Sequence, residues 1–122
     1  MNNPIGWFEI YVQDMQRAKE FYQAVFDVTF SPLSSPDLDI WAFPMDQTSY
    51  GASGALVKMP GMQPSGTGVL VYFRCDDCAV QAQRAVQAGG TLQRAKISIG
   101  QYGHMALVVD TEGNLIGLHS MN

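Results

Sequence analysis

A strand-like segment, a capping aspartate and an amphipathic helix follow one another twice in this chain of 122 residues. In the first copy, apolar residues alternate over residues 6–12, and Asp14 precedes apolar residues at helical spacing. In the second copy, residues 69–75 precede Asp77 and a helical pattern over residues 78–88. The two halves of the chain are therefore expected to share one folding plan.

A single offset relates the two halves. Placing the second capping aspartate on the first gives 63 residues (77 − 14). The pairs of residues that this offset relates are Asp14 and Asp77, Trp7 and Leu70, and Gly54 and Gly117. Because several elements agree on one offset, we interpret the pattern as an internal duplication.

Further strands follow each helix. After the first helix and a loop rich in proline and serine, strands are expected at 38–43 and 51–58, with room for a short one at 47–50. After the second helix they are expected at 91–99, 104–109 and 115–120. The sequence thus predicts an α+β fold of two tandem βαβββ modules in a single domain, residues 1–122. Module one covers about 4–59, the linker about 60–67 and module two about 68–122.

Alternation along the first strand of each module separates two faces. Phe8, Ile10 and Val12 form an apolar face that should pack on the helix. The opposite faces are expected to line a cavity between two curved sheets. Their residues are Trp7, Glu9 and Tyr11 in module one, and Leu70, Tyr72 and Arg74 in module two.

Composition narrows the class of partner. A net charge of −4, with only 7 lysines and arginines, argues against nucleic acid or an anionic membrane as partner and favours a small organic ligand. Residues 68–73 form one of the longest apolar stretches and are too few to span a bilayer. No signal peptide is visible, and two cysteines do not form a disulfide framework, so a cytoplasmic protein is expected.

Several motifs, in this order, resemble the vicinal oxygen chelate superfamily. They are Phe8-Glu9-Ile10 with Asp14 and Phe21-Tyr22, the middle Gly51-x-x-Gly54-Ala55-Leu56, Val71-Tyr72-Phe73 with Asp76-Asp77, and the closing Asp110-x-Glu112-Gly113-Asn114 with Ile116-Gly117-Leu118-His119-Ser120. The superfamily includes glyoxalase I, bleomycin-resistance proteins and extradiol dioxygenases. The chain is most similar to the group described as predicted enzymes related to lactoylglutathione lyase. The resemblance implies paired βαβββ modules and commonly a homodimer with the cavity near the interface.

The resemblance also implies where a metal would be held. Metal-dependent members carry a ligand seven residues before the first capping aspartate, another at the matching point of the second half, and a Glu in the last strand. In this chain these positions are Trp7, Leu70 and Gly117. An indole, an isobutyl group and a hydrogen cannot coordinate a divalent cation. We therefore expect no cofactor, and a divalent metal only through a shifted site.

Glu9 follows Trp7 by two residues, and His119 follows Gly117 by two residues. Each should therefore lie on the same face of its strand as the position that it follows. One hypothesis makes them an acid/base or metal pair, since a carboxylate can keep an imidazole oriented and basic. The alternative is that they hydrogen-bond each other or backbone groups near the rim of a pocket.

Aromatic residues give the other candidate contacts with a ligand. The expected ligand-binding residues are Trp7, Tyr11, Trp41, Tyr50, Tyr72 and Arg74. Large rings at lost ligand positions favour a dry pocket for a flat or aliphatic molecule, although such rings also pack in cores without any ligand.

Two other features are interpreted as incidental. His104 begins a strand, where a surface or interface position is the simpler explanation. Cys75 and Cys78 have redox spacing, but the two carboxylates between them disfavour the thiolate.

The leading functional hypothesis is a metal-free protein that binds a small organic molecule in a cavity between its modules. The rival is a metal-dependent lyase or isomerase, or a dioxygenase, that uses Glu9 and His119. A third possibility is a domain that only dimerises with or regulates another protein.

Overall fold

The computed structural model describes residues 3–62, 64 and 68–122, which divide into two compact units. The first unit is Trp7–Val69, and the second unit joins residues up to Gly6 with Leu70–Asn122. Of the expected linker at 60–67, residues 63 and 65–67 lie outside the described residues.

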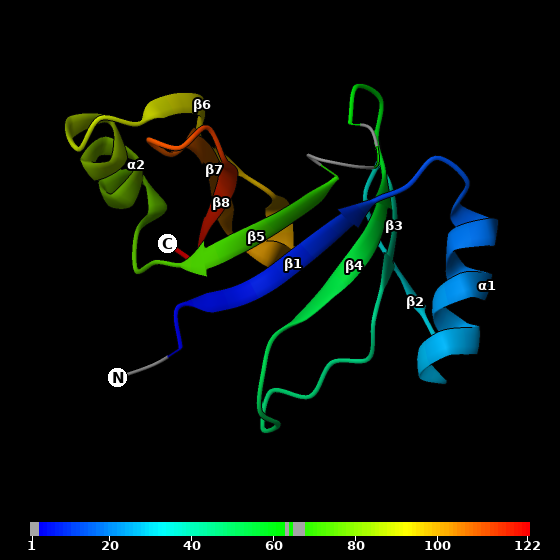
Figure 1. The fold of residues 1–122 in the computed structure, drawn as a ribbon. Coiled ribbons are helices and arrows are strands. Elements are labelled where there is room, and N and C mark those ends of the chain that lie inside the picture. Colours follow the sequence, from blue (N-terminus) through cyan, green and yellow to red (C-terminus); the bar gives the residue numbers. More distant parts are fainter. Residues whose placement is uncertain (1–2, 63, 65–67) are drawn as a thin grey trace. The chain divides into compact units, whose positions relative to one another are not determined.

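The first unit follows the expected βαβββ order, and the mixed α+β class is confirmed (Figure 1). Its elements are β1 (Ile5–Tyr11), α1 (Met15–Phe26), β2 (Ser31–Leu33), β3 (Asp39–Ala42) and β4 (Ser53–Lys58). The strands lie in the order β2-β3-β4-β1, with β1 parallel to β4 and the other pairs antiparallel. The first strand and the strand that ends the module are therefore neighbours.

Local chemistry sets the limits of α1. Asp14 has an extended backbone, and its Oδ1 accepts a hydrogen bond of 3.0 Å from the backbone N–H of Arg17. The helix ends where Asp27 adopts the left-handed conformation (φ 54°) and its N–H donates to the carbonyl of Gln23. The sequence correctly predicted the cap at Asp14.

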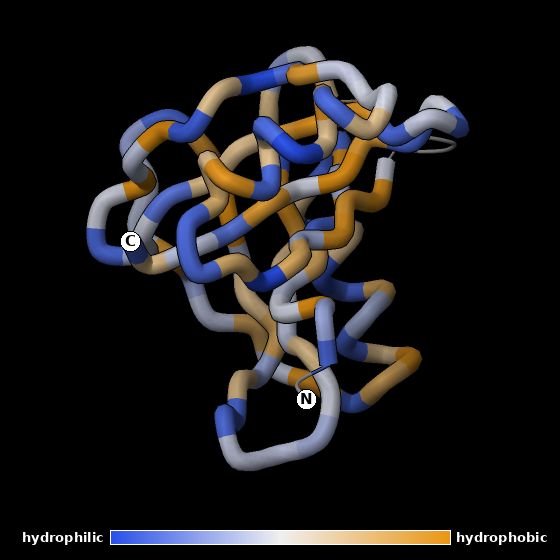
Figure 2. Tube along the Cα trace, turned by 90° about the vertical axis from the view of Figure 1, so that its left-hand side faces the viewer, coloured by the Kyte–Doolittle hydropathy of each residue, from blue (hydrophilic) through white to orange (hydrophobic). Residues whose placement is uncertain are grey.

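The apolar face of β1 packs on α1, as expected. Val12, Met15, Phe30 and Leu56 form the buried core of the first unit, with Ile10 packed against it. Aromatic rings extend this core, since Phe43 lies 4.6 Å from Phe30, 5.4 Å from Phe8 and 5.8 Å from Tyr22, measured between centroids. In Figure 2, which colours the trace by hydropathy, the long loop between β3 and β4 is mostly pale to blue and therefore mostly hydrophilic.

The second unit repeats the order. Its elements are β5 (Val69–Arg74), α2 (Cys78–Gln87), β6 (Thr91–Ser98), the short 3₁₀ helix η1 (Gly100–Tyr102), β7 (His104–Val109) and β8 (Leu115–Ser120). The strand order is β5-β8-β7-β6, with β5 parallel to β8. The small residues Cys78, Ala82 and Ala106 pack with Val108 and Leu118 in its core.

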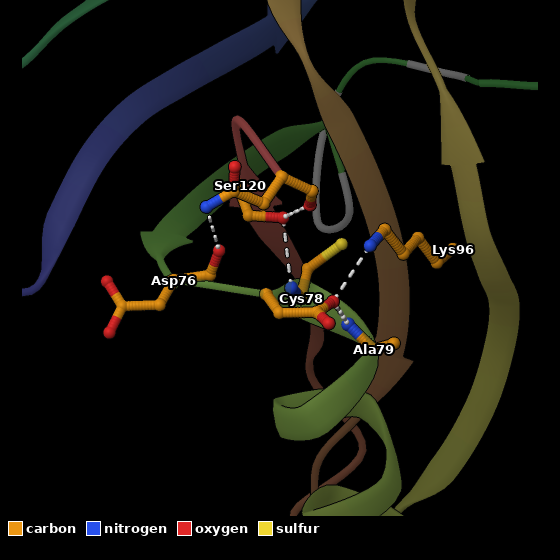
Figure 3. Close-up of polar contacts among 7 residues, drawn as sticks. Asp76, Cys78, Ala79, Lys96 and Ser120 are labelled. Atoms are coloured by element: carbon orange, nitrogen blue, oxygen red, sulfur yellow. Dashed lines mark hydrogen bonds and ion pairs between the residues drawn. The ribbon is translucent and has the colours of Figure 1, made fainter.

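Polar contacts fix the start of α2 (Figure 3). Oδ1 of Asp77 accepts from the backbone N–H of Ala79 at 3.0 Å and forms an ion pair of 2.8 Å with Lys96. The backbone N–H of Cys78 donates to the hydroxyl of Ser120 at 2.9 Å, and that hydroxyl donates to the carbonyl of Asn122. The end of the chain is thereby fastened to the start of α2.

One expected strand is wrong. Residues 47–50 form a turn instead, because Asp46 accepts hydrogen bonds from the hydroxyls of Thr48 and Ser49, at 2.7 Å each. These contacts lower the pKa of Asp46 to about 2, with the Thr48 hydroxyl as the largest cause. The additional strand of the module is β2, which contains Pro32 and pairs only with β3.

The single offset of 63 residues is also wrong for the last strands. Ile10 pairs with Leu56 on the helix side of the first unit, and Phe73 pairs with Leu118 on the helix side of the second. The first strands keep the offset of 63 (73 − 10), whereas the last strands differ by 62 (118 − 56). Gly54 and Gly117 therefore lie on opposite faces, and the residue equivalent to Gly117 is Ala55.

No helix in the described part of the chain is long and apolar enough to cross a membrane.

Candidate ligand-binding site

In the first unit, two aromatic side chains hold the carboxylate of Glu9. The hydroxyl of Tyr11 donates to Oε1 at 2.6 Å, and Nε1 of Trp7 donates to Oε2 at 3.3 Å. All three residues belong to β1, where alternation places them on the face opposite α1, as expected. The structure thus brings together three predicted site residues as one charged group between two rings.

Small side chains lie beside this carboxylate in the sheet. Glu9 pairs with Ala55 of β4, and Ala55 pairs with Ala42 of β3. Both alanines are fully buried. Within the row formed by Glu9, Ala55 and Ala42, only Glu9 carries a polar or charged side chain.

In the second unit, the ring of Tyr72 occupies the space beside Gly117. The two residues are direct partners in the parallel pair of β5 and β8. A Cβ built on Gly117 would lie 2.8 Å from Cγ of Tyr72 and would overlap Cδ1 and Cε1. No side chain can therefore be added at this position unless the ring moves.

His119 lies farther along β8, in register with Arg74. Its Nε2 is 2.6 Å from the carbonyl oxygen of Tyr102. Because a carbonyl can only accept, Nε2 carries the hydrogen in this contact. No sequence pattern pointed to Tyr102, which reaches His119 through the 3₁₀ turn that precedes β7.

Two predicted site residues lie elsewhere in the first unit. Trp41 packs against the helix-side core, with Nζ of Lys19 3.4 Å from its ring centroid, and its Nε1 donates to Asp39. Tyr50 is 98% exposed in the loop between β3 and β4, beside a shallow hollow of about 250 Å³. Neither residue lies with Glu9 in the structure of this unit.

A larger hollow, of about 510 Å³, borders the start of α1. Tyr11 and Tyr22 line it together with Arg17, whereas Trp7 and Glu9 do not. Tyr11 therefore lines this hollow and also donates a hydrogen bond to Glu9.

The residues at the three positions that the resemblance implies for metal ligands do not fit a metal. Leu70 carries no donor atom in its side chain, and Nε1 of Trp7 can only donate a hydrogen. At Gly117 the ring of Tyr72 also takes the room that a carboxylate would need. Among residues 3–62, 64 and 68–122, no three His, Cys, Asp or Glu side chains gather as a group that could hold a metal ion.

The cysteines and His104 lie on the helix side of the second unit. Burial raises the pKa of the Cys75 thiol, and the neighbouring Cys78 raises it further, so the reactive thiolate is disfavoured. His104 pairs with Ser120, and its buried Nδ1 has no hydrogen-bond partner in the part of the chain that the structure describes.

The comparisons with known proteins come from sequence and from structure. The model of the Glyoxalase/Bleomycin resistance protein/Dioxygenase superfamily matches residues 4–118. A search of curated proteins found no significant match. By structure, the chain is similar to a methylmalonyl-CoA epimerase in complex with methylmalonyl-CoA and NH4+, with a TM-score of 0.68 and 18% identity over 96% of this chain and 93% of the epimerase.

Two further solved structures have the same fold. One is a hypothetical protein from Bacillus halodurans C-125, with a TM-score of 0.74 and 11% identity over 97% of this chain and 94% of that chain. The other is a superfamily member from Vibrio splendidus 12B01, with a TM-score of 0.66 and 19% identity over 95% and 97%. The family match spans nearly the whole chain and agrees with the paired βαβββ units, so this protein belongs to the glyoxalase/bleomycin resistance protein/dioxygenase superfamily.

Proposed function

We propose that this protein binds a small organic molecule through the Glu9 face of the first unit, without the metal site usual in metal-dependent relatives. The observation that carries the proposal is the carboxylate held between Trp7 and Tyr11, at 3.3 and 2.6 Å. The absence of donor atoms at Trp7, Leu70 and Gly117 supports binding without a metal.

The chemistry around Glu9 favours a ligand with a positive charge. An ionised carboxylate attracts an ammonium group, and flanking aromatic rings add cation–π attraction. The net charge of −4 also favours the approach of cations over anions. The proposed ligand class is therefore a small organic amine with an apolar body.

Isothermal titration with benzylamine tests this proposal, with benzoate and benzyl alcohol as probes of matched size. The wild type should bind benzylamine saturably and bind the other two at least tenfold more weakly, about 1.4 kcal/mol. Glu9→Gln should lose at least this factor, because it removes the charge but preserves the size of the side chain. The control is Glu20→Gln, which makes the same change on the exposed face of α1. Equal affinity for all three probes would contradict the proposal.

A second candidate function is acid/base catalysis by His119 of the second unit, in a lyase, an isomerase or a dioxygenase with a shifted metal site. The contact between Nε2 of His119 and the carbonyl oxygen of Tyr102 favours it, because the contact orients the imidazole ring. Calorimetric titration with Zn²⁺, Ni²⁺ and Mn²⁺ tests whether this function uses a metal. If it does, one of these ions should bind at micromolar concentration, and His119→Gln should abolish that binding.

We also propose a cytoplasmic homodimer. Phe21, Val25 and Phe26 of α1 are 58%, 54% and 61% exposed, and association would bury such side chains. Sedimentation equilibrium at micromolar concentration should give twice the mass of 13.4 kDa, and a single-chain mass would exclude the dimer.

A further inference from the structure

We propose that Tyr72 is the residue that excludes a divalent metal from the second unit, because its ring fills the volume that a ligand side chain at position 117 would need. The inference rests on the proposed metal-free function and deepens it. It assigns the loss of the metal site to a side chain that is not itself at a ligand position.

The sheet register explains the overlap. Tyr72 and Gly117 are direct neighbours on parallel strands, so their side chains point to the same face. Carbon atoms in ordinary contact lie about 3.5–4.0 Å apart. A Cβ at position 117 would be 2.8 Å from Cγ of Tyr72 and closer still to two other ring atoms, so even alanine would displace the ring.

The ring has little room to move away. Tyr72 is 8% exposed, and Gly117 is bounded on its other side by its partner Leu107 in β7. A glutamate at position 117 would place more atoms than alanine in the same space. Restoring donor atoms while Tyr72 remains would therefore not restore a metal site.

The equivalent position in the first unit shows that the lack of room at position 117 is specific to the second unit. Ala55 occupies that position and already carries a Cβ beside Glu9. The sheet itself therefore tolerates a side chain there. The obstacle in the second unit is the ring of Tyr72.

A double-mutant cycle tests the geometric part of this inference. Gly117→Ala is made in the wild type and in Tyr72→Ala, and urea midpoints are measured for all four proteins. Gly117→Ala should lower the midpoint clearly when Tyr72 is present and change it much less in the Tyr72→Ala background. The same loss in both backgrounds would overturn the inference.

Metal titration tests the functional part. The double substitution Leu70→His and Gly117→Glu supplies donors in the second unit, and it is made with Tyr72 intact, with Tyr72→Phe and with Tyr72→Ala. Calorimetry with Ni²⁺ should show at least tenfold tighter binding for the protein that carries Tyr72→Ala than for the other two. Tyr72→Phe is the matched control, because it keeps the ring and removes the hydroxyl. Equal affinity in all three proteins would show that the ring does not exclude the metal.

These outcomes are separate from those of the proposed function. Benzylamine binding in EDTA tests the function in the wild-type protein, whereas the cycle and the Ni²⁺ titration test Tyr72. If the triple variant does not fold, the urea cycle still decides whether the ring and the position 117 side chain compete for space.

Discussion

The two units share the order βαβββ, but they use their glycines on opposite faces. Gly54 in the first unit lies on the helix side, where an added Cβ would overlap the carbonyl oxygen of Phe8. Gly117 in the second unit lies on the other side, under the ring of Tyr72. Because the last strands of the two units differ in offset by one residue from the first strands, the two glycines make room for different groups.

The comparison separates a structural requirement from a functional one. At Gly54 the obstacle includes a backbone carbonyl oxygen of β1, in addition to the ring of Phe8. At Gly117 the obstacle is one side chain, so the face away from the helix has been altered by a particular residue. Only the second of these differences bears on what the protein can bind.

The largest expected effect on stability comes from truncating the core leucines that occupy equivalent positions in the two units. Leu56→Ala and Leu118→Ala should each cost about 2–5 kcal/mol in the free energy of unfolding. Leu56 should cost more, because it is fully buried among larger side chains, whereas Leu118 packs against small ones. Urea denaturation of the two variants checks this, and a larger loss for Leu118→Ala would contradict the comparison of the two cores.

Smaller losses in the free energy of unfolding are expected when the two glycines are replaced by alanine. Gly54→Ala should cost about 1–3 kcal/mol or more, because the overlapping oxygen belongs to the backbone of β1. Gly117→Ala should cost less, since displacing one ring disturbs fewer contacts than displacing the backbone of a strand. Both free energies come from urea unfolding under the same conditions. A larger cost at Gly117 would reverse this ranking.

The smallest effect concerns the caps of the helices. In the second unit the hydrogen bond from the side chain of Lys96, within their ion pair, is the largest cause that lowers the pKa of Asp77 from its ordinary value. A lowered folded-state pKa contributes stability above the unfolded value near 3.8, and this contribution is lost as the pH falls through the folded value. Lys96→Met should therefore reduce the loss of stability on acidification below about pH 4.

Thermal unfolding between about pH 7 and pH 2 measures this effect. Lys58→Met is the control, because Lys58 is an exposed lysine of the first unit. Parallel curves for the wild type and Lys96→Met would show that the ion pair does not contribute to the dependence on pH.

Much of the fold could be predicted from local patterns. Asp14 and Asp77 cap their helices as their positions before apolar helical segments indicated. The strand β2 was missed because Pro32 and its neighbours have the composition of a loop. The turn after Asp46 was mistaken for a strand because side-chain hydrogen bonds, and not alternation, determine its shape.

The site was less predictable because it depends on pairing between strands. Alternation alone placed Trp7, Glu9 and Tyr11 on one face, and their mutual hydrogen bonds agree with that prediction. The neighbours of Gly117 follow from the register of β5 on β8, which no local pattern encodes. The same applies to Tyr102 and His119, which are 17 residues apart in sequence.

The most direct test of the central claim is the titration of the wild-type protein with benzylamine in the presence and absence of EDTA. We expect the same saturable binding in both conditions, because in our proposal Glu9 and its flanking rings bind the ligand without a metal. Binding that disappears in EDTA and returns with added Zn²⁺ or Mn²⁺ would show instead that the site depends on a metal.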